Sequence, residues 1–135
     1  MSNLRDRLKS EATEVRRFLE GEGRELSDFF RNFPIGACGN ASDLLGEWIM
    51  EKHSLALEYV NGDRNGKSHG WLEIDGLAVD ITSDQFPDGL GGVYCGELND
   101  FFSSFKAQVR STPVVSPMLK PVYTAMKSAL ETDYR

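Results

Sequence analysis

The dipeptide Asp75-Gly76 lies between two short segments in which apolar and polar residues alternate. Asp-Gly favours a two-residue type I′ hairpin, and a turn of that length allows only one register for the strands beside it. We therefore predict antiparallel strands over Ser68–Asp75 and Leu77–Thr82. The expected pairs are Ile74 with Leu77, Glu73 with Ala78, Leu72 with Val79, Trp71 with Asp80 and His69 with Thr82.

This register separates the side chains of the hairpin into two faces. One face is apolar and consists of Leu72, Ile74, Leu77, Val79 and Ile81, whereas the other carries His69, Trp71, Glu73, Ala78 and Asp80. On the second face Asp80 is diagonal to His69, at a backbone spacing of ~7–8 Å that long side chains can bridge. The carboxylate is expected to hold one ring nitrogen of His69 and to leave the other facing a nucleophile.

Cys38 is the expected nucleophile. A stripe of apolar residues at helical spacing follows it, formed by Ala41, Leu44, Leu45, Trp48 and Ile49, so Cys38 is predicted to begin a helix. The positive end of the helix dipole and a neighbouring imidazolium both favour the reactive thiolate. Gly36 and Gly39 leave room for a substrate carbonyl, and the Cys38 backbone amide is positioned to donate to an oxyanion.

The other elements define an α+β fold in which the Cys-bearing helix packs on a small antiparallel sheet of three or more strands with flanking helices. Residues 1–135 are expected to form a single domain, with N-terminal helices over 1–33, a core over 34–95 and a C-terminal helical region over 96–135. Within these ranges we predict a tight loop at Phe33–Gly36, a strand over Leu55–Val60, a polar turn over Asn61–Lys67, and helices over Glu97–Val109 and Pro121–Leu130. A flexible, glycine-containing connection is expected to lead into Val93–Cys95.

Composition excludes several classes of function. The chain has 15 Lys and Arg against 21 Asp and Glu, a net charge of −6, which argues against nucleic-acid binding. It has no apolar run long enough to cross a membrane and no secretory signal, so a cytoplasmic protein is expected, with export by a signal-independent route as the alternative. Cys38 and Cys95 are then free thiols, a disulfide between them being the alternative, and their spacing from His53 and His69 predicts no metal or other cofactor.

The segments Gly36-Ala37-Cys38-Gly39-Asn40-Ala41, Ser68-His69-Gly70-Trp71-Leu72-Glu73 and Val79-Asp80-Ile81-Thr82 together resemble the transglutaminase-like branch of the papain-like cysteine enzymes. The resemblance covers about residues 33–86. It implies a papain-like core and a Cys-His-Asp triad, with Cys38 as nucleophile, His69 as general base and acid, and Asp80 as the orienting carboxylate. It also implies that Asn32, six residues before Cys38, is an oxyanion donor; helix termination is the alternative for Asn32.

The expected function is that of a cysteine hydrolase or acyltransferase, of peptidase, deamidase or transglutaminase type, acting through a thioester on a peptide, protein or small-molecule amide. The alternative is a binding module of inhibitor or immunity type, whose acidic rim at Asp84–Gly92 contacts a basic protein; a redox sensor using both cysteines is a third hypothesis. Each residue also has a structural alternative. Trp71 is a substrate platform or packing, and His53 favours the C-terminus of its helix over catalysis. Asp84 and Gln85 shape the rim of a cleft or cap a turn.

Overall fold

The hairpin around Asp75-Gly76 is present in the computed structural model, which describes residues 3–132. Asp75 and Gly76 have φ of 50° and 78°, the left-handed values that a type I′ turn requires at both central positions. The flanking strands are β2 (Lys67–Ile74) and β3 (Leu77–Asp80). Three predicted pairs are confirmed: Ile74 with Leu77, Glu73 with Ala78 and Leu72 with Val79.

The predicted pairs Trp71–Asp80 and His69–Thr82 are wrong, because the ladder between β2 and β3 ends before them. The Asp80 carboxylate turns the chain at this point. Its Oδ1 accepts a hydrogen bond from the Thr82 backbone N–H at 2.9 Å, and the chain continues into the short 3-10 helix η2 (Ser83–Gln85).

Five strands form one antiparallel sheet in the order β4-β3-β2-β1-β5. Its remaining members are β1 (Glu58–Arg64), β4 (Tyr94–Glu97) and β5 (Lys106–Ser111). β1 begins later than predicted and runs through most of the predicted polar turn, because only Asn65-Gly66 turns, with φ of 54° and 80°. The two hairpin turns of the sheet therefore have the same left-handed geometry.

The helix predicted over Glu97–Val109 is wrong, and so is a purely helical region after residue 95. Only the single turn α4 (Asp100–Ser103) is helical, capped by the Asn99 side chain, which accepts from the Phe101 N–H at 2.9 Å. Phe101, Phe102 and Phe105 have helical spacing but all three are buried against the sheet. The chain then extends and pairs with β1, so tertiary packing decides the structure of this segment.

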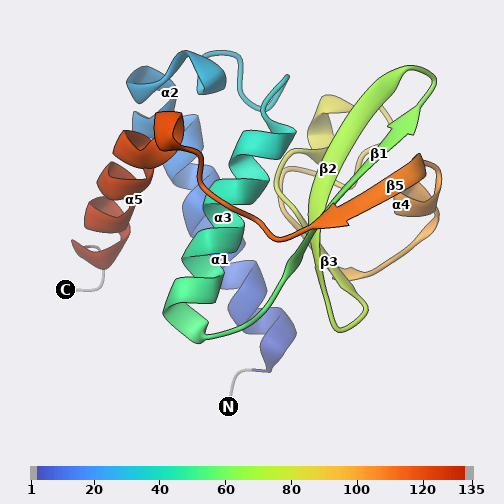
Figure 1. The fold of residues 1–135 in the computed structure, drawn as a ribbon, viewed down its shortest axis with the longest axis horizontal. Helices are drawn as coiled ribbons and strands as arrows, with labels where there is room; N and C mark the ends of the chain where they lie inside the picture. The colour runs from blue at the N-terminus through green and yellow to red at the C-terminus, as the bar shows by residue number, and fades with distance from the viewer. Residues whose placement is uncertain (1–2, 133–135) are drawn as a thin grey trace.

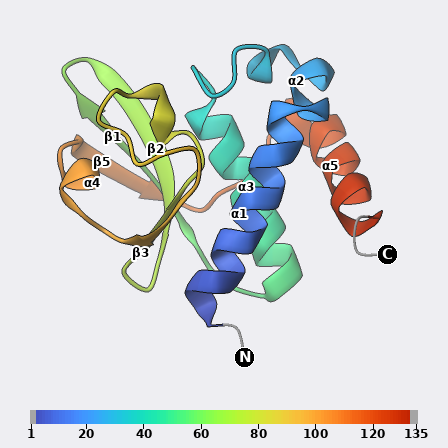
Figure 2. The same ribbon diagram turned by 180° about the vertical axis from the view of Figure 1, so that it is seen from behind.

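Four helices, α1 (Leu4–Glu20), α2 (Glu22–Leu26), α3 (Cys38–His53) and α5 (Lys120–Thr132), lie together on one side of the molecule in Figure 1, with α4 on the other side. Figure 2 shows α1 beside α3 from behind. Packing of α3 on β2 and β1, and of α1 on β3 and β4, covers one face of the sheet. None of the helices within residues 3–132 is long and apolar enough to cross a membrane. The remaining helical elements are the 3-10 helices η1 (Asp28–Phe30) and η3 (Pro117–Leu119).

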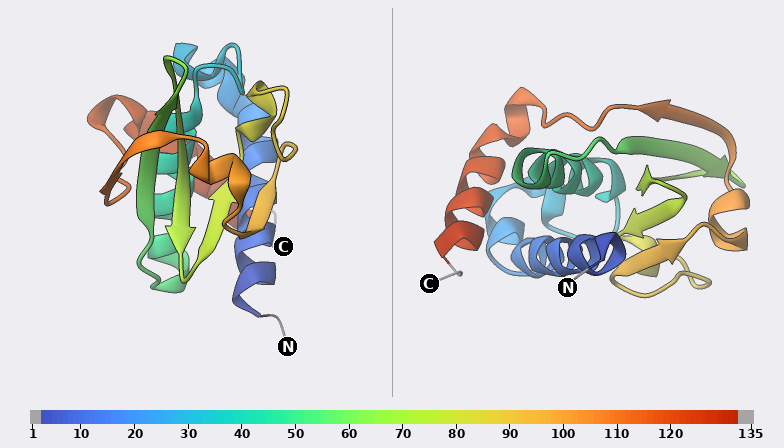
Figure 3. Two further views of the ribbon diagram at one scale, coloured as in Figure 1. Left: turned by 90° about the vertical axis from the view of Figure 1, so that its right-hand side faces the viewer. Right: turned by 90° about the horizontal axis from the view of Figure 1, so that it is seen from below.

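Each face of the sheet has its own apolar core, whereas the hairpin register predicted an apolar surface on only one face. The larger core joins α1, α3 and α5 to the face that carries Leu72, Val79 and Ile81. The smaller core lies on the opposite face and consists of Val60, Trp71, Ala78, Phe86, Phe101, Phe102 and Phe105. Figure 3 shows the helices on one side of the sheet and α4 at the other end of the molecule. His69 and Asp80 belong to the face with the smaller core.

Candidate active site

Cys38 is the first residue of α3, as predicted. A turn over residues 33–36, with a cis bond at Phe33–Pro34 and Gly36 at φ 72°, leads into the helix. The N-cap residue, Ala37, makes no side-chain hydrogen bond to the first turn. The backbone N–H groups beside Cys38 are therefore not occupied by a capping side chain, and the partly exposed thiol lies at the positive end of the helix.

His69 is fully buried on β2 among aromatic rings. Its ring centroid lies 5.0 Å from that of Phe86, 5.3 Å from Phe105, 5.6 Å from Trp71 and 5.8 Å from Phe101. Rings on several sides leave the imidazole little freedom to rotate. The smaller core thus fixes the direction in which each ring nitrogen points.

Asp80 holds one of those nitrogens. Its Oδ2 lies 2.6 Å from His69 Nε2, and both side chains are completely buried. The other carboxylate oxygen accepts from the Thr82 N–H, so both oxygens of Asp80 have partners. The expected contact between Asp80 and His69 on one face of the hairpin is confirmed, and it leaves Nδ1 as the ring nitrogen available to a thiol.

Cys38 also acts on the pKa of His69. Burial alone would lower the pKa of His69, but the hydrogen bond to Asp80 and the interactions with Cys38 outweigh burial and raise this pKa from 6.5 to about 9. Both partners act by hydrogen bonding and by charge. The imidazolium is therefore the main form of His69 at neutral pH, which places a positive charge next to the sulfur.

Tyr59 of β1 connects the first turn of α3 to β2. A side chain at Gly70 would put its Cβ 2.2 Å from the Tyr59 hydroxyl oxygen, and one at Gly39 would put it 3.3 Å from the same atom. The Tyr59 hydroxyl thus lies against the backbone next to both Cys38 and His69, and it accepts a hydrogen bond from Asn61 Nδ2 at 3.0 Å. Two glycines allow this close packing, which helps to hold the thiol near the ring.

A surface cleft of about 390 Å³ lies beside the segments that carry Cys38 and His69. Ile35, three residues before Cys38, and Ser68, next to His69, are among the residues that line it. Gln85 lines it too, with its Nε2 3.5 Å from His69 Nδ1. The cleft therefore reaches the His69 ring through Gln85 and is lined by the turn that precedes Cys38. It is large enough for part of a peptide or another small amide.

Arg16 is a site residue that sequence reasoning missed. Its guanidinium makes two 2.8 Å contacts with the Asp84 carboxylate and donates to the backbone oxygens of Ile81 at 2.8 Å and Gly92 at 3.1 Å. These contacts tie α1 to the segment that carries Gln85. Only a helical stripe of charges marks Arg16 in the sequence, and nothing local connects it to residues more than sixty positions away.

The predicted oxyanion and substrate residues have different surroundings in the structure. Asn32 is exposed in the turn after η1 and its carbonyl oxygen accepts from the Ile35 N–H at 2.8 Å, which fits the helix-terminating alternative. Trp71 has no exposed surface and donates to Glu73 Oε2 at 2.8 Å, so it is a packing residue and the substrate platform is wrong. Gly36 is exposed in the turn before Cys38, where its positive φ excludes most other residues.

Both cysteines are free thiols, so the alternative disulfide is wrong. Cys95 lies on β4 and contacts the Arg5 carbonyl oxygen at 3.5 Å, and burial raises the pKa of its thiol. His53 ends α3 as expected, with its Nε2 2.6 Å from Glu11 Oε2. Among residues 3–132, no three His, Cys, Asp or Glu side chains are arranged to hold a metal ion.

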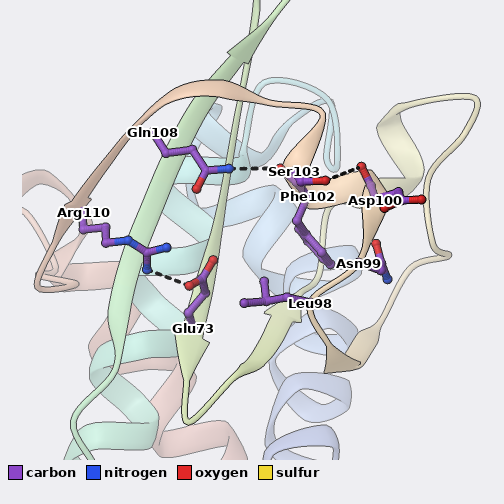
Figure 4. Close-up of a pocket in the computed structure, with 8 residues that line it drawn as sticks. All are labelled: Glu73, Leu98, Asn99, Asp100, Phe102, Ser103, Gln108 and Arg110. Atoms are coloured by element: carbon purple, nitrogen blue, oxygen red, sulfur yellow. Dashed lines mark hydrogen bonds and ion pairs between the residues drawn. The ribbon is translucent and has the colours of Figure 1, made fainter.

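A second hollow, of about 340 Å³, lies near α4 and is shown in Figure 4. Glu73 receives the Arg110 guanidinium at 2.6 Å, and Gln108 Nε2 donates to the backbone oxygens of Phe102 and Phe105. These polar groups bind one another. The cleft lined by Gln85 is the better candidate for catalysis, because the Gln85 amide reaches within 3.5 Å of His69 Nδ1.

The geometry described above combines a thiol at a helix N-terminus, an imidazole and a buried carboxylate. Such a set can generate a thiolate, transfer a proton and stabilise the imidazolium, which are the steps of nucleophilic catalysis at a carbonyl. Comparison of the chain with protein families, curated proteins and solved structures finds no match. Function is therefore argued from the site itself.

Proposed function

We propose that this protein is a cysteine-dependent hydrolase or acyltransferase that acts on an amide through a thioester intermediate. The observation that carries the proposal is the 2.6 Å contact of His69 Nε2 with Asp80, together with Cys38 at the start of α3 as a second group that raises the pKa of the same ring. Packing alone does not explain why a buried imidazole interacts with a thiol at a helix N-terminus. The order Cys-His-Asp and the helix on an antiparallel sheet support a papain-like core of transglutaminase type.

The chemistry follows from the roles of the three groups. The Cys38 thiolate attacks the amide carbonyl carbon, and the first-turn N–H groups of α3 donate to the oxygen that becomes negative. His69 gives its proton to the departing amine as the C–N bond breaks and a thioester forms. His69 then takes a proton from water or from an acceptor amine, which attacks the thioester and releases Cys38.

The alternative of a non-catalytic binding module has less support. That hypothesis needs an acidic rim at Asp84–Gly92 available to a basic partner. Asp84 is instead paired with Arg16, and Asp88 receives the Arg64 guanidinium through two contacts of 2.8 Å. The rim therefore presents less negative charge than its sequence indicates, and the interaction of Cys38 with His69 favours catalysis.

The two cysteines allow a test within one molecule. Alkylation of an ordinary thiol by iodoacetamide becomes roughly tenfold faster per pH unit up to about pH 8.5, because only the thiolate reacts. We expect Cys38 to be alkylated at about pH 6 at nearly its full rate, whereas Cys95 stays unmodified at that pH. Peptide mapping by mass spectrometry measures both sites in one sample.

Two variants serve as controls for this experiment. Cys38→Ala is expected to abolish alkylation at about pH 6 and to leave the circular dichroism spectrum unchanged, whereas Cys95→Ala is expected to keep it. If Cys38 reacts with the pH dependence of an ordinary thiol, the thiol is not activated and the proposal is wrong. Incubation of wild-type protein with a peptide library then identifies the acyl donor and the acceptor from the mass changes.

A further inference from the structure

Gln85 is a polar side chain of the cleft that approaches the His69 imidazole. Its Nε2 lies 3.5 Å from His69 Nδ1, the ring nitrogen that Asp80 leaves free. The same atom donates to the Thr82 carbonyl oxygen at 3.1 Å. Gln85 also lines the cleft together with Ile35, from the turn that precedes Cys38. Its amide therefore lies in the wall of the cleft, next to the His69 ring.

The Thr82 carbonyl fixes which end of the amide faces the ring. A carbonyl oxygen only accepts, so the amide atom beside it is the NH₂ group. One of its two N–H groups is used by Thr82. The imidazolium form of His69 carries a proton on Nδ1 and cannot accept the other N–H. This second N–H is therefore left to donate to a ligand in the cleft.

The segment around Gln85 is held rigidly. Arg16 binds Asp84, the preceding residue, through two 2.8 Å contacts. Ser83 Oγ donates to the Gly91 carbonyl oxygen at 3.0 Å and accepts from the Leu90 N–H at 3.0 Å. A donor that is positioned before the substrate arrives stabilises a developing charge without reorganisation, as an oxyanion hole requires.

We propose that Gln85, rather than Asn32, supplies the side-chain donor of the oxyanion hole, acting together with the backbone N–H of Cys38. The inference rests on the proposed function, because an oxyanion forms only if Cys38 attacks a carbonyl. Gln85 follows Cys38 by 47 positions in the chain. Its place in the site is set by the turn after Asp80 and not by any spacing from the nucleophile.

Two probes of Cys38 separate an oxyanion donor from a residue that only orients His69. Iodoacetamide alkylates the sulfur by displacing iodide from carbon, and no oxyanion forms. p-Nitrophenyl acetate acylates the same sulfur: the S–C bond forms, the carbonyl oxygen becomes negative, and the ester C–O bond then breaks to release p-nitrophenolate. Only the second reaction needs an oxyanion hole. Its burst is measured by absorbance, and alkylation is measured by intact mass.

We expect Gln85→Ala to lower the acylation rate by about 10²–10³-fold and to leave the alkylation rate at about pH 6 within roughly threefold of wild type. Gln85→Met keeps the length of the side chain without the donor and is expected to behave in the same way, which guards against misfolding of the Ala variant. Gln108→Met is the matched control, because Gln108 also donates to two backbone oxygens but lies in the other hollow. It is expected to change neither rate.

Each other outcome overturns a different statement. Equal losses in both rates would mean that Gln85 only orients His69, and no loss in either would remove it from the mechanism. If wild-type protein is alkylated rapidly but not acylated, no working oxyanion hole is present and the inference fails while the activated thiol stands. If wild-type Cys38 is not alkylated at about pH 6, the proposed function itself fails.

Discussion

The molecule contains two histidine–carboxylate pairs of the same length. His53 Nε2 lies 2.6 Å from Glu11 Oε2 between α3 and α1, and His69 Nε2 lies 2.6 Å from Asp80 Oδ2 on the sheet. In each pair the carboxylate also accepts at least one further hydrogen bond. The distance between imidazole and carboxylate therefore does not distinguish a structural pair from a catalytic one.

The pairs differ in what else they contact. Glu11 also binds the Trp48 indole N–H at 2.8 Å and the Lys52 ammonium at 2.9 Å, so His53 is one of several donors that neutralise a buried acid. At the other pair, Asp80 and Cys38 both raise the pKa of His69. The nearby thiol, and not the carboxylate, is what distinguishes His69 from His53.

The largest expected effect comes from replacing each histidine by asparagine. His69→Asn removes the imidazolium beside Cys38 and is expected to slow alkylation at about pH 6 by about 10²–10⁴-fold, the usual contribution of an acid–base group. His53→Asn should leave that rate unchanged. The second-order rate constant for iodoacetamide, read from intact mass, measures both. If His69→Asn and His53→Asn slowed alkylation equally, the two histidine–carboxylate pairs would not differ in their effect on Cys38.

The pairs should also stabilise the protein in opposite pH ranges. The pKa of His69 is raised in the folded state from 6.5 to about 9, so its stabilisation is complete below the unfolded value and is lost as pH rises toward 9. That loss is of the order of 3 kcal/mol. Urea unfolding between about pH 6.5 and 9 should show a decline that Asp80→Asn largely abolishes.

Glu11 supplies the matching experiment at low pH. Burial favours a higher pKa of Glu11, but hydrogen bonds from His53, Lys52 and Trp48 outweigh burial and lower its pKa. The stabilisation from this pair is therefore present above the ordinary value of 4.5 and lost as pH falls below it. Glu11→Gln should remove the acidic dependence and retain the decline above pH 6.5. A variant that removed both slopes would show that the two pairs are coupled.

Gly70→Ala should have an intermediate effect on stability and on the alkylation of Cys38, and it should disturb the His69 pair but not the His53 pair. The new Cβ would lie 2.2 Å from the Tyr59 hydroxyl oxygen, so Tyr59 must move away from the first turn of α3. We expect a loss of about 1–3 kcal/mol in the free energy of unfolding and a slower alkylation of Cys38 at pH 6. Gly21→Ala is the control, since its nearest contact would be an ordinary 3.6 Å to the Arg17 carbonyl oxygen.

Sequence patterns predicted the parts of this comparison that depend on local rules. Asp75-Gly76 determined the register that puts His69 and Asp80 on one face, and the apolar stripe after Cys38 predicted the start of α3. The same rules failed at Phe101, Phe102 and Phe105, where helical spacing reflects burial against the sheet. Periodicity cannot distinguish those outcomes, because the partner surface is distant in sequence.

The remaining site residues depend on contacts that no local pattern encodes. Arg16 reaches Asp84 across 68 positions, and Gln85 approaches His69 across 16, after a turn that the hairpin register did not foresee. The resemblance indicated Asn32 as the oxyanion donor by its spacing from Cys38, whereas the contacts of Gln85 depend on where the chain turns after Asp80. A spacing taken from a family applies to this chain only where the backbone between the two residues follows the same path as in that family.

The smallest expected effect comes from a substitution at Thr82, beside Asp80. The two carboxylates differ in their bonding, because Glu11 is bound by side chains whereas Asp80 also accepts from the Thr82 backbone N–H. The Thr82 hydroxyl is buried and has no hydrogen-bond partner within the described part of the chain. Thr82→Val keeps the shape and the N–H, so the free energy of unfolding should rise by about 1 kcal/mol with alkylation of Cys38 unchanged. Thr13→Val, which loses a 2.8 Å bond to the Lys9 carbonyl oxygen, should not stabilise. If Thr82→Val slowed the alkylation of Cys38, the Thr82 hydroxyl would be needed to position the His69 pair. The backbone N–H of Thr82 alone would then not be enough to hold Asp80.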